Sequence, residues 1–113
     1  MSSVCVINAI EVPSHMVQVA LDVRDQYIAY FKTKAGFVSS TFYRAIDDGS
    51  AYTYINVVVW ASQAHFEAVV NQGFSDAEGE NEDGMKVLGR GFPAPIVVHP
   101  GRYEIIRSDV ATS

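Results

Sequence analysis

The sequence predicts an α+β domain in which a four-stranded sheet carries two helices on one face. Two observations indicate this class. Segments that alternate at strand period and segments with helical spacing follow one another in the order β-α-β-β-α-β, which is the ferredoxin-like arrangement. The chain has 113 residues, which suits one domain with one core. We therefore expect residues 1–113 to form a single domain.

The first strand and the first helix are predicted before Gly36. Val4 to Val12 alternates, and its even-numbered residues, Asn8 among them, share one face. Ser14 is expected to cap a long helix, because its hydroxyl can accept a hydrogen bond from a free first-turn N–H. Gly36 is expected to stop that helix. The apolar stripe of the helix comprises Val17, Ala20, Leu21, Tyr27 or Ile28, and Phe31.

The second and third strands form a predicted hairpin. Residues 37–46 alternate loosely, and Asp47-Asp48-Gly49-Ser50 is a turn signal whose glycine would supply a positive φ. The following stretch, 52–60, has no solvent face, which predicts a central strand covered on both sides. Asn56 and Trp60 lie four residues apart on this strand and therefore share one face.

The second helix is predicted to begin directly after the central strand. Ser62 is the expected N-cap, and Phe66, Val69 and Val70 follow at helical spacing until about Gln72. Residues 71–95 are rich in glycine and acidic residues, so we expect a long loop that could act as a lid.

The last strand is predicted over residues 96–107, with an interruption at Pro100-Gly101. A proline there favours an edge position or a bulge, because proline cannot donate to a sheet ladder. Residues 108–113 are polar and are expected to form a loose tail.

Composition and charge limit the partners. The net charge of −5 argues against nucleic acid and anionic membranes, since both attract basic patches. No apolar run is long enough to span a bilayer, and the N-terminus lacks the layout of a signal peptide. Cys5 is the only cysteine and cannot form an internal disulfide, so we expect a reduced, cytoplasmic setting.

The acidic residues 76–83 lack the spacing of a calcium-binding loop, and no metal-ligand spacing occurs, so no metal site is predicted.

The predicted sheet would leave its second face apolar and uncovered. Two helices cover only one face, and the strands carry apolar residues on both. Because soluble monomers rarely expose such a patch, we expect a homodimer that packs sheet against sheet.

The turn between the central strand and the second helix carries a family resemblance. The chain combines Trp60-Ala61-Ser62 and Phe66 with the central strand, and Gly36-Phe37 precedes the second strand. In these features it resembles the antibiotic biosynthesis monooxygenase family, whose members are small dimeric α/β barrels. The resemblance covers the chain from the first strand through the second helix, and it fits poorly from Asn71 onward.

The resemblance implies a cofactor-free monooxygenase that oxidises an anthrone, quinol or other small aromatic molecule with O2. Asn56 and Trp60 match the pair that holds the substrate in the anthrone oxygenases, and both side chains are hydrogen-bond donors. They are the candidate catalytic residues. The candidate pocket residues are Asn8, Tyr54, His65 and Phe66, of which His65 could act as a general base.

Two other functions stay open. A small-molecule binding or dimerisation module would keep the fold without chemistry, and Trp60 and Asn56 would then be ordinary core residues. A haem-binding or haem-degrading relative would explain Asn8, which resembles an asparagine of that group. Those relatives need a histidine about ten residues past the tryptophan, where this chain has Val70.

The chain also departs from the anthrone oxygenases at two positions. They carry a tyrosine where this chain has Phe66, and their arginine has no clear counterpart, since Arg90 lies in the unmatched loop.

Overall fold

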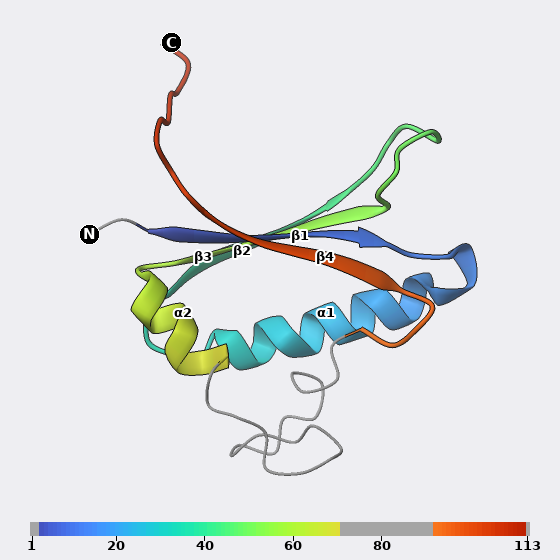
Figure 1. The fold of residues 1–113 in the computed structure, drawn as a ribbon, viewed down its shortest axis with the longest axis horizontal. Helices are drawn as coiled ribbons and strands as arrows, with labels where there is room; N and C mark the ends of the chain where they lie inside the picture. The colour runs from blue at the N-terminus through green and yellow to red at the C-terminus, as the bar shows by residue number, and fades with distance from the viewer. Residues whose placement is uncertain (1–2, 71–91, 113) are drawn as a thin grey trace.

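The fold is a four-stranded antiparallel sheet with two α-helices on one face (Figure 1). The computed structural model describes residues 3–70 and 92–112. Its elements are β1 (Val4–Glu11), a 3-10 turn η1 (Ser14–Met16), α1 (Val17–Phe31), β2 (Phe37–Arg44), β3 (Tyr54–Trp60), α2 (Gln63–Val70) and β4 (Val97–Glu104). This order confirms the predicted α+β, ferredoxin-like class.

The strand order is β2-β3-β1-β4, so β1 and β3 are the central pair. In their antiparallel register the residues that face the helices stand directly opposite one another. From one end of the pair to the other, these opposed residues are Val4 with Trp60, Val6 with Val58, Asn8 with Asn56, and Ile10 with Tyr54. Three of the four pairs are apolar, and the pair Asn8–Asn56 interrupts them.

Two hydrophobic clusters form the core between the sheet and the helices. The first contains the pairs on one side of Asn8–Asn56 and the second contains the pair on the other side. The first cluster comprises Val4, Val6, Ile28, Phe31, Val58, Trp60, Phe66 and Val69. The second comprises Ile10, Val12, Ala20, Tyr54 and Ile96.

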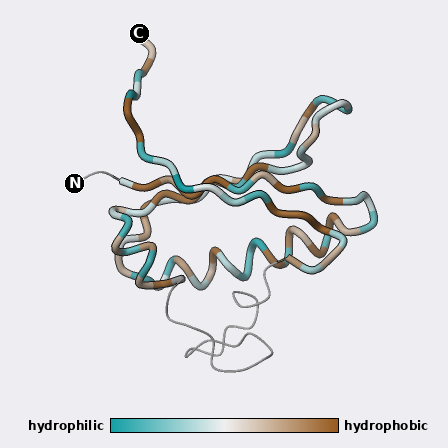
Figure 2. The backbone as a smooth tube through the Cα atoms, viewed as in Figure 1, coloured by the Kyte–Doolittle hydropathy of each residue, from teal (hydrophilic) through white to brown (hydrophobic). Residues whose placement is uncertain are grey.

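The opposite face of the sheet has no helix on it (Figure 1). Strongly hydrophobic residues follow the strands (Figure 2), and the odd-numbered residues from Cys5 to Ala9 in β1 and from Ile55 to Val59 in β3 remain only half-buried in the single chain. Tyr43 and Tyr103 flank this face and are 54% and 55% exposed. We call the surface formed by these residues the bare face; its central residues are Cys5, Ile7, Ala9, Ile55, Val57 and Val59.

Ser14 does not cap α1, which corrects one prediction. Ser14 lies in the 3-10 turn, and α1 begins at Val17 with Met16 at its N-cap and no side-chain hydrogen bond. Pro13 is the reason: its carbonyl accepts the Met16 N–H at 2.8 Å, which forms a tight turn before the α-helix.

Gly49 does not adopt a positive φ, which corrects another prediction. The four-residue turn closes with the Ser50 N–H donating to the Asp47 carbonyl at 3.1 Å, but β2 and β3 are joined by the nine residues 45–53. A connection of this length does not require the left-handed geometry of a two-residue hairpin. Among the described glycines, Gly36 has the positive φ, 89°, where the chain turns into β2.

Strand β4 continues through Pro100, although an interruption was expected there. The ladder to β1 is unbroken, and Pro100 stands opposite Asn8. Because β4 is an edge strand, as the proline predicted, Pro100 needs no hydrogen bond on its outer side. Because the strand is continuous, the residues of β4 alternate between the two faces of the sheet without a break as far as Glu104.

Part of the predicted lid, 71–91, lies outside the described residues. Within the described ranges, neither helix is long and apolar enough to cross a membrane.

Candidate functional site

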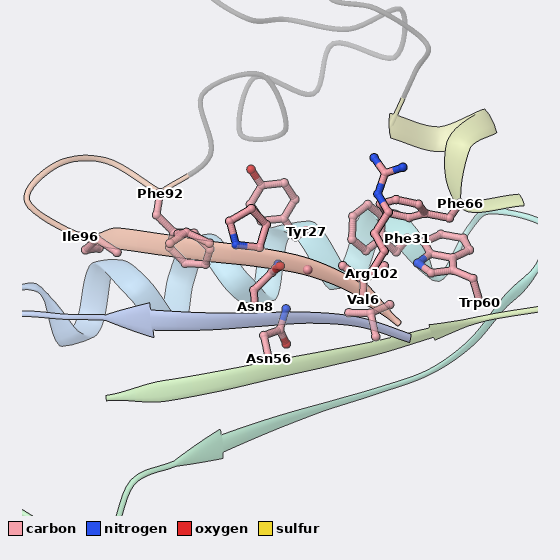
Figure 3. Close-up of a pocket in the computed structure, with 14 residues that line it drawn as sticks. Val6, Asn8, Tyr27, Phe31, Asn56, Trp60, Phe66, Phe92, Ile96 and Arg102 are labelled. Atoms are coloured by element: carbon pink, nitrogen blue, oxygen red, sulfur yellow. The ribbon is translucent and has the colours of Figure 1, made fainter. Parts of the chain in front are cut away.

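A cavity of about 440 Å³ lies between the sheet and helix α1 (Figure 3). This volume is in the range of small-molecule sites. Its lining comes from β1, β3 and β4, from both helices and from the segment before β4. The lining residues are Val6, Asn8, Tyr27, Phe31, Asn56, Val58, Trp60, Phe66, Phe92, Ile96, Val98, Pro100, Gly101 and Arg102.

Two asparagine side chains form part of the floor of the cavity. Asn8 and Asn56 extend side by side from β1 and β3 toward α1 (Figure 3). Asn56 is 7% exposed, and the Oδ1 atoms of both residues are buried without a hydrogen-bond partner in the part of the chain that the structure describes. A buried polar atom that lacks a partner costs about 1–3 kcal/mol. The fold carries this cost at two adjacent positions, so these amides are poor candidates for purely structural residues.

Trp60 closes one end of the cavity with a third unpartnered group. Its side chain is fully buried, and its ring packs edge-on against Phe31 and Phe37 at centroid distances of 5.4 and 5.7 Å. The indole Nε1–H can only donate, and no acceptor reaches it in the described structure. Three unpartnered polar atoms, two amide oxygens and one indole N–H, therefore belong to residues that line one cavity.

The remaining walls combine aliphatic residues with four aromatic ones, Tyr27, Phe31, Phe66 and Phe92. Tyr27 lies 5.9 Å from Phe31 and 6.0 Å from Phe92, ring centroid to centroid, and Phe66 lies 6.2 Å from Trp60. Aromatic walls exclude water and offer flat surfaces on which a planar ligand can stack. With the amides at the floor, they suit a planar aromatic molecule that carries oxygen substituents.

Arg102 supplies the charge at the cavity. It projects from β4 toward α2 (Figure 3), and its guanidinium carbon lies 4.7 Å from the centroid of the Phe66 ring. The sequence interpretation missed this residue, along with Tyr27, Phe31, Phe92 and Ile96. Unbroken alternation from Val98 through Pro100 to Arg102 would have placed Arg102 on the helix-facing side, but the expected interruption hid it.

Four of the six predicted site residues line the cavity: Asn8, Asn56, Trp60 and Phe66. Tyr54 does not. It faces the helices as expected, but it lies one pair beyond Asn8–Asn56, in the second core cluster, where it stacks on Phe42 at 4.9 Å. The side chain of Tyr54 is therefore occupied by core packing.

His65 also lies outside the cavity lining, because it takes part in the start of α2. Ser62 is the N-cap, as predicted: its Oγ accepts the His65 backbone N–H at 3.2 Å. The same Oγ lies 2.8 Å from His65 Nδ1, to which the hydroxyl donates when that nitrogen is unprotonated. A Cβ at Gly36 would overlap the imidazole, so the ring also packs against the turn into β2. These contacts hold His65 at the helix start and away from the cavity.

No group of three or more His, Cys, Asp or Glu side chains suited to a metal ion occurs in residues 3–70 and 92–112. The three histidines of the chain are all described, and none lines the cavity.

Comparison with known proteins gives structural similarity only. No family model matches the chain, and no curated protein matches it. A candidate monooxygenase from Shewanella loihica PV-4 is 26% identical, with a TM-score of 0.70 over 96% of this chain and 99% of that chain. SnoaB, a cofactor-independent oxygenase from Streptomyces nogalater, is 18% identical, with a TM-score of 0.70 over 96% and 97%. The haem-degrader MhuD from Mycobacterium tuberculosis, solved with two haems in its active site, is 20% identical, with a TM-score of 0.63 over 96% and 99%.

Fold and site together define a ferredoxin-like α+β domain with an aromatic cavity on the helix side of its sheet. The solved structures above share this fold, and they include a cofactor-independent oxygenase and a haem-degrader. The particular reaction has to be argued from the cavity of this chain.

Because the buried Asn56 amide oxygen lacks a partner, we expect this residue to lower the stability of the folded protein. Asn56→Leu is expected to raise the free energy of unfolding by about 1 kcal/mol, because it removes a buried polar group without a partner and the cavity has room for the larger side chain. Denaturant unfolding at one fixed protein concentration measures this.

Thr53→Val is the matched control. Thr53 Oγ1 accepts the Val12 N–H at 3.0 Å and can donate to the Val12 carbonyl at 3.3 Å, so its loss is expected to lower stability by about 1 kcal/mol. If Asn56→Leu destabilised the protein as Thr53→Val does, the Asn56 amide would be a structural group.

Proposed function

We propose that the protein is a cofactor-free monooxygenase that oxidises a small aromatic molecule of the anthrone or quinol type with O2. The observation that carries the proposal is the set of unpartnered polar groups of Asn8, Asn56 and Trp60 at one aromatic cavity. The two amide oxygens can accept hydrogen bonds and the indole N–H can donate one, so together they suit a ligand that carries hydroxyl groups. The resemblance of Asn56, Trp60 and Ser62 to the antibiotic biosynthesis monooxygenase family supports the same proposal, as does the similarity to SnoaB.

The reaction follows from the chemistry of an ionised aromatic hydroxyl or enol. A substrate with a CH2 group between its rings loses a proton to become an enolate, which is electron-rich enough to reduce O2. A new C–O bond forms at that carbon. Loss of water then leaves a carbonyl, so one oxygen atom stays on the substrate and the other leaves with the two hydrogens of the CH2 group. No further oxidant or reductant is needed.

The protein stabilises the enolate by hydrogen bonding. The Asn56 amide N–H and the Trp60 indole N–H are the donors that would face the developing negative charge, in a cavity from which aromatic side chains exclude water. Asn8 stands beside Asn56 and would hold a second oxygen of the substrate. Donors that are fixed in place before the reaction need no reorganisation during it.

The groups that could remove a proton from the substrate limit which substrates fit the site. Tyr27 and Arg102 are the titratable side chains among the described lining residues, and neither a carboxylate nor an imidazole is present there. His65, the predicted base, is engaged by Ser62 outside the cavity. Among the described lining residues no strong base is available, so this lining suits a substrate whose enol or hydroxyl ionises readily.

Haem degradation is the weaker candidate. It would require a histidine ligand, and His15, His65 and His99 all lie outside the cavity lining. A binding module without chemistry is the outcome to expect if ligands bind and no oxygen is consumed.

We also propose that the protein is a homodimer joined through the bare face, because this face is apolar and half-exposed in the single chain. Sedimentation is expected to give the mass of two chains, and Val57→Lys, at the centre of that face, is expected to give the mass of one. Ala29→Lys, on the exposed side of α1, is the control and should keep the mass of two. A wild-type mass of one chain would contradict the dimer.

Oxygen uptake by metal-free protein tests the activity. We expect turnover of an anthrone, hydroquinone or catechol from a panel, with kcat about 100-fold lower in Asn56→Ala and in Trp60→Phe, because each removes one donor to the enolate oxygen. Gln26→Ala, exposed on α1, should behave as wild type. Turnover that both cavity variants retain would remove these residues from the mechanism, and no uptake with any substrate would favour the binding module.

A further inference from the structure

Arg102 is the charged residue among the described cavity lining, and the proposed oxidation does not use it. It stands opposite Val6 in the β1–β4 ladder, and Pro100 stands opposite Asn8. Arg102 is therefore displaced from the asparagine pair by two residues of strand, or about 7 Å. The cavity thus has polar groups at two separated positions with aromatic walls between them (Figure 3).

The guanidinium of Arg102 is oriented by its neighbours but not saturated by them. It lies over the Phe66 ring, with 4.7 Å from Cζ to the ring centroid, a cation–π contact that favours this position of the guanidinium. Its ion pair among the described residues, Nη1 to Glu67 Oε1, is 3.7 Å long, which is beyond hydrogen-bond distance, and both side chains are nearly half exposed. The N–H donors of the fork are thus available to a stronger acceptor.

A carboxylate is the group that this fork recognises best. Its two oxygens match two parallel N–H donors, and the charge-assisted bonds are stronger than bonds between neutral groups. The chain as a whole carries a charge of −5, which repels anions. Among the described lining residues, Arg102 is the group that can attract an anion.

We propose that the cavity selects aromatic acids: Arg102 binds a carboxylate at one end of the ligand, and the Asn8–Asn56 pair binds a hydroxyl or keto oxygen at the other. The fused ring system between them stacks among Phe31, Phe66 and Tyr27. This inference rests on the proposed function and names its substrate class, a hydroxylated polycyclic aromatic carboxylic acid.

Two ligands that differ only in charge test the proposal. 6-Hydroxy-2-naphthoate carries its hydroxyl and carboxylate at opposite ends of a fused ring system, and 6-hydroxy-2-naphthamide is its uncharged counterpart of similar size. Isothermal titration calorimetry of the wild-type protein is expected to give a Kd about tenfold lower for the acid than for the amide, in line with a charge-assisted hydrogen bond. This preference should shrink as salt is raised, because salt screens a half-exposed charge.

Variants at Arg102 test whether this residue causes the preference for the acid over the amide. Arg102→Gln is expected to bind the acid and the amide equally, with little change in its Kd for the amide. Arg102→Lys should keep part of the preference, since it retains the charge without the planar fork. Arg44→Gln removes an exposed positive charge outside the cavity and should leave the preference intact.

Three results would overturn the proposal: equal affinity of the wild-type protein for acid and amide, an unchanged preference in Arg102→Gln, or no binding of either ligand. Binding is measured without turnover, so this test is separate from that of the oxygenase. Acid preference without oxygen uptake would leave Arg102 as the carboxylate site of a binding protein. Turnover of neutral substrates with no acid preference would leave the oxygenase and remove the carboxylate site.

Discussion

The opposed amides of Asn8 and Asn56 are the constraint on which the rest of the structure depends. They occupy one of the four helix-facing pairs of the central strands, and the other three are apolar. Apolar side chains on either side pack into two separate core clusters, and neither cluster provides a partner for the amide oxygens. Both amides line the cavity instead. A core chosen for stability alone would place two apolar residues here and close the gap.

The surrounding structure keeps this polar pair in place. Trp60 is packed by three phenylalanines, so its indole N–H has a fixed direction. Ser62 caps α2 with its hydroxyl and holds His65 against Gly36, which sets the start of the helix that carries Phe66. Because Phe66 in turn lies beneath the Arg102 guanidinium, the helix start also positions the charge at the cavity. Capping, aromatic packing and the polar site thus form one connected arrangement.

The sequence predicted the fold well because its signals are local and agree with one another. Alternation in β1 and β3 and the Ser62 cap each indicate the observed structure. Gly36 makes the turn into β2 with its positive φ, but it does not stop the helix, since α1 already ends at Phe31. The sequence also placed Asn56 and Trp60 on one face, since parity along a single strand needs no knowledge of other strands. That Asn8 stands opposite Asn56 could not be predicted, because register between β1 and β3 depends on how α1 and β2 pack.

The residues that were missed or misplaced depend on longer-range structure. Arg102 was not foreseen because Pro100 was expected to break the strand, whereas an edge strand accommodates it. Tyr54 shares the face of Asn56, but the division of the core assigns it to the other cluster. His65 could equally point to a pocket or to a cap by spacing alone, and the packing at Gly36 decides for the cap.

The indole N–H of Trp60 gives the most direct test of the central claim, that unpartnered polar groups in the cavity await an oxygen-bearing aromatic ligand. Trp60 is the only tryptophan, so a ¹⁵N-labelled sample has one indole signal. Titration with an anthraquinone that carries a hydroxyl and a carboxylate should move this signal downfield and slow its exchange with solvent as the N–H gains an acceptor. An indole signal that stays unchanged through saturating ligand would contradict the account.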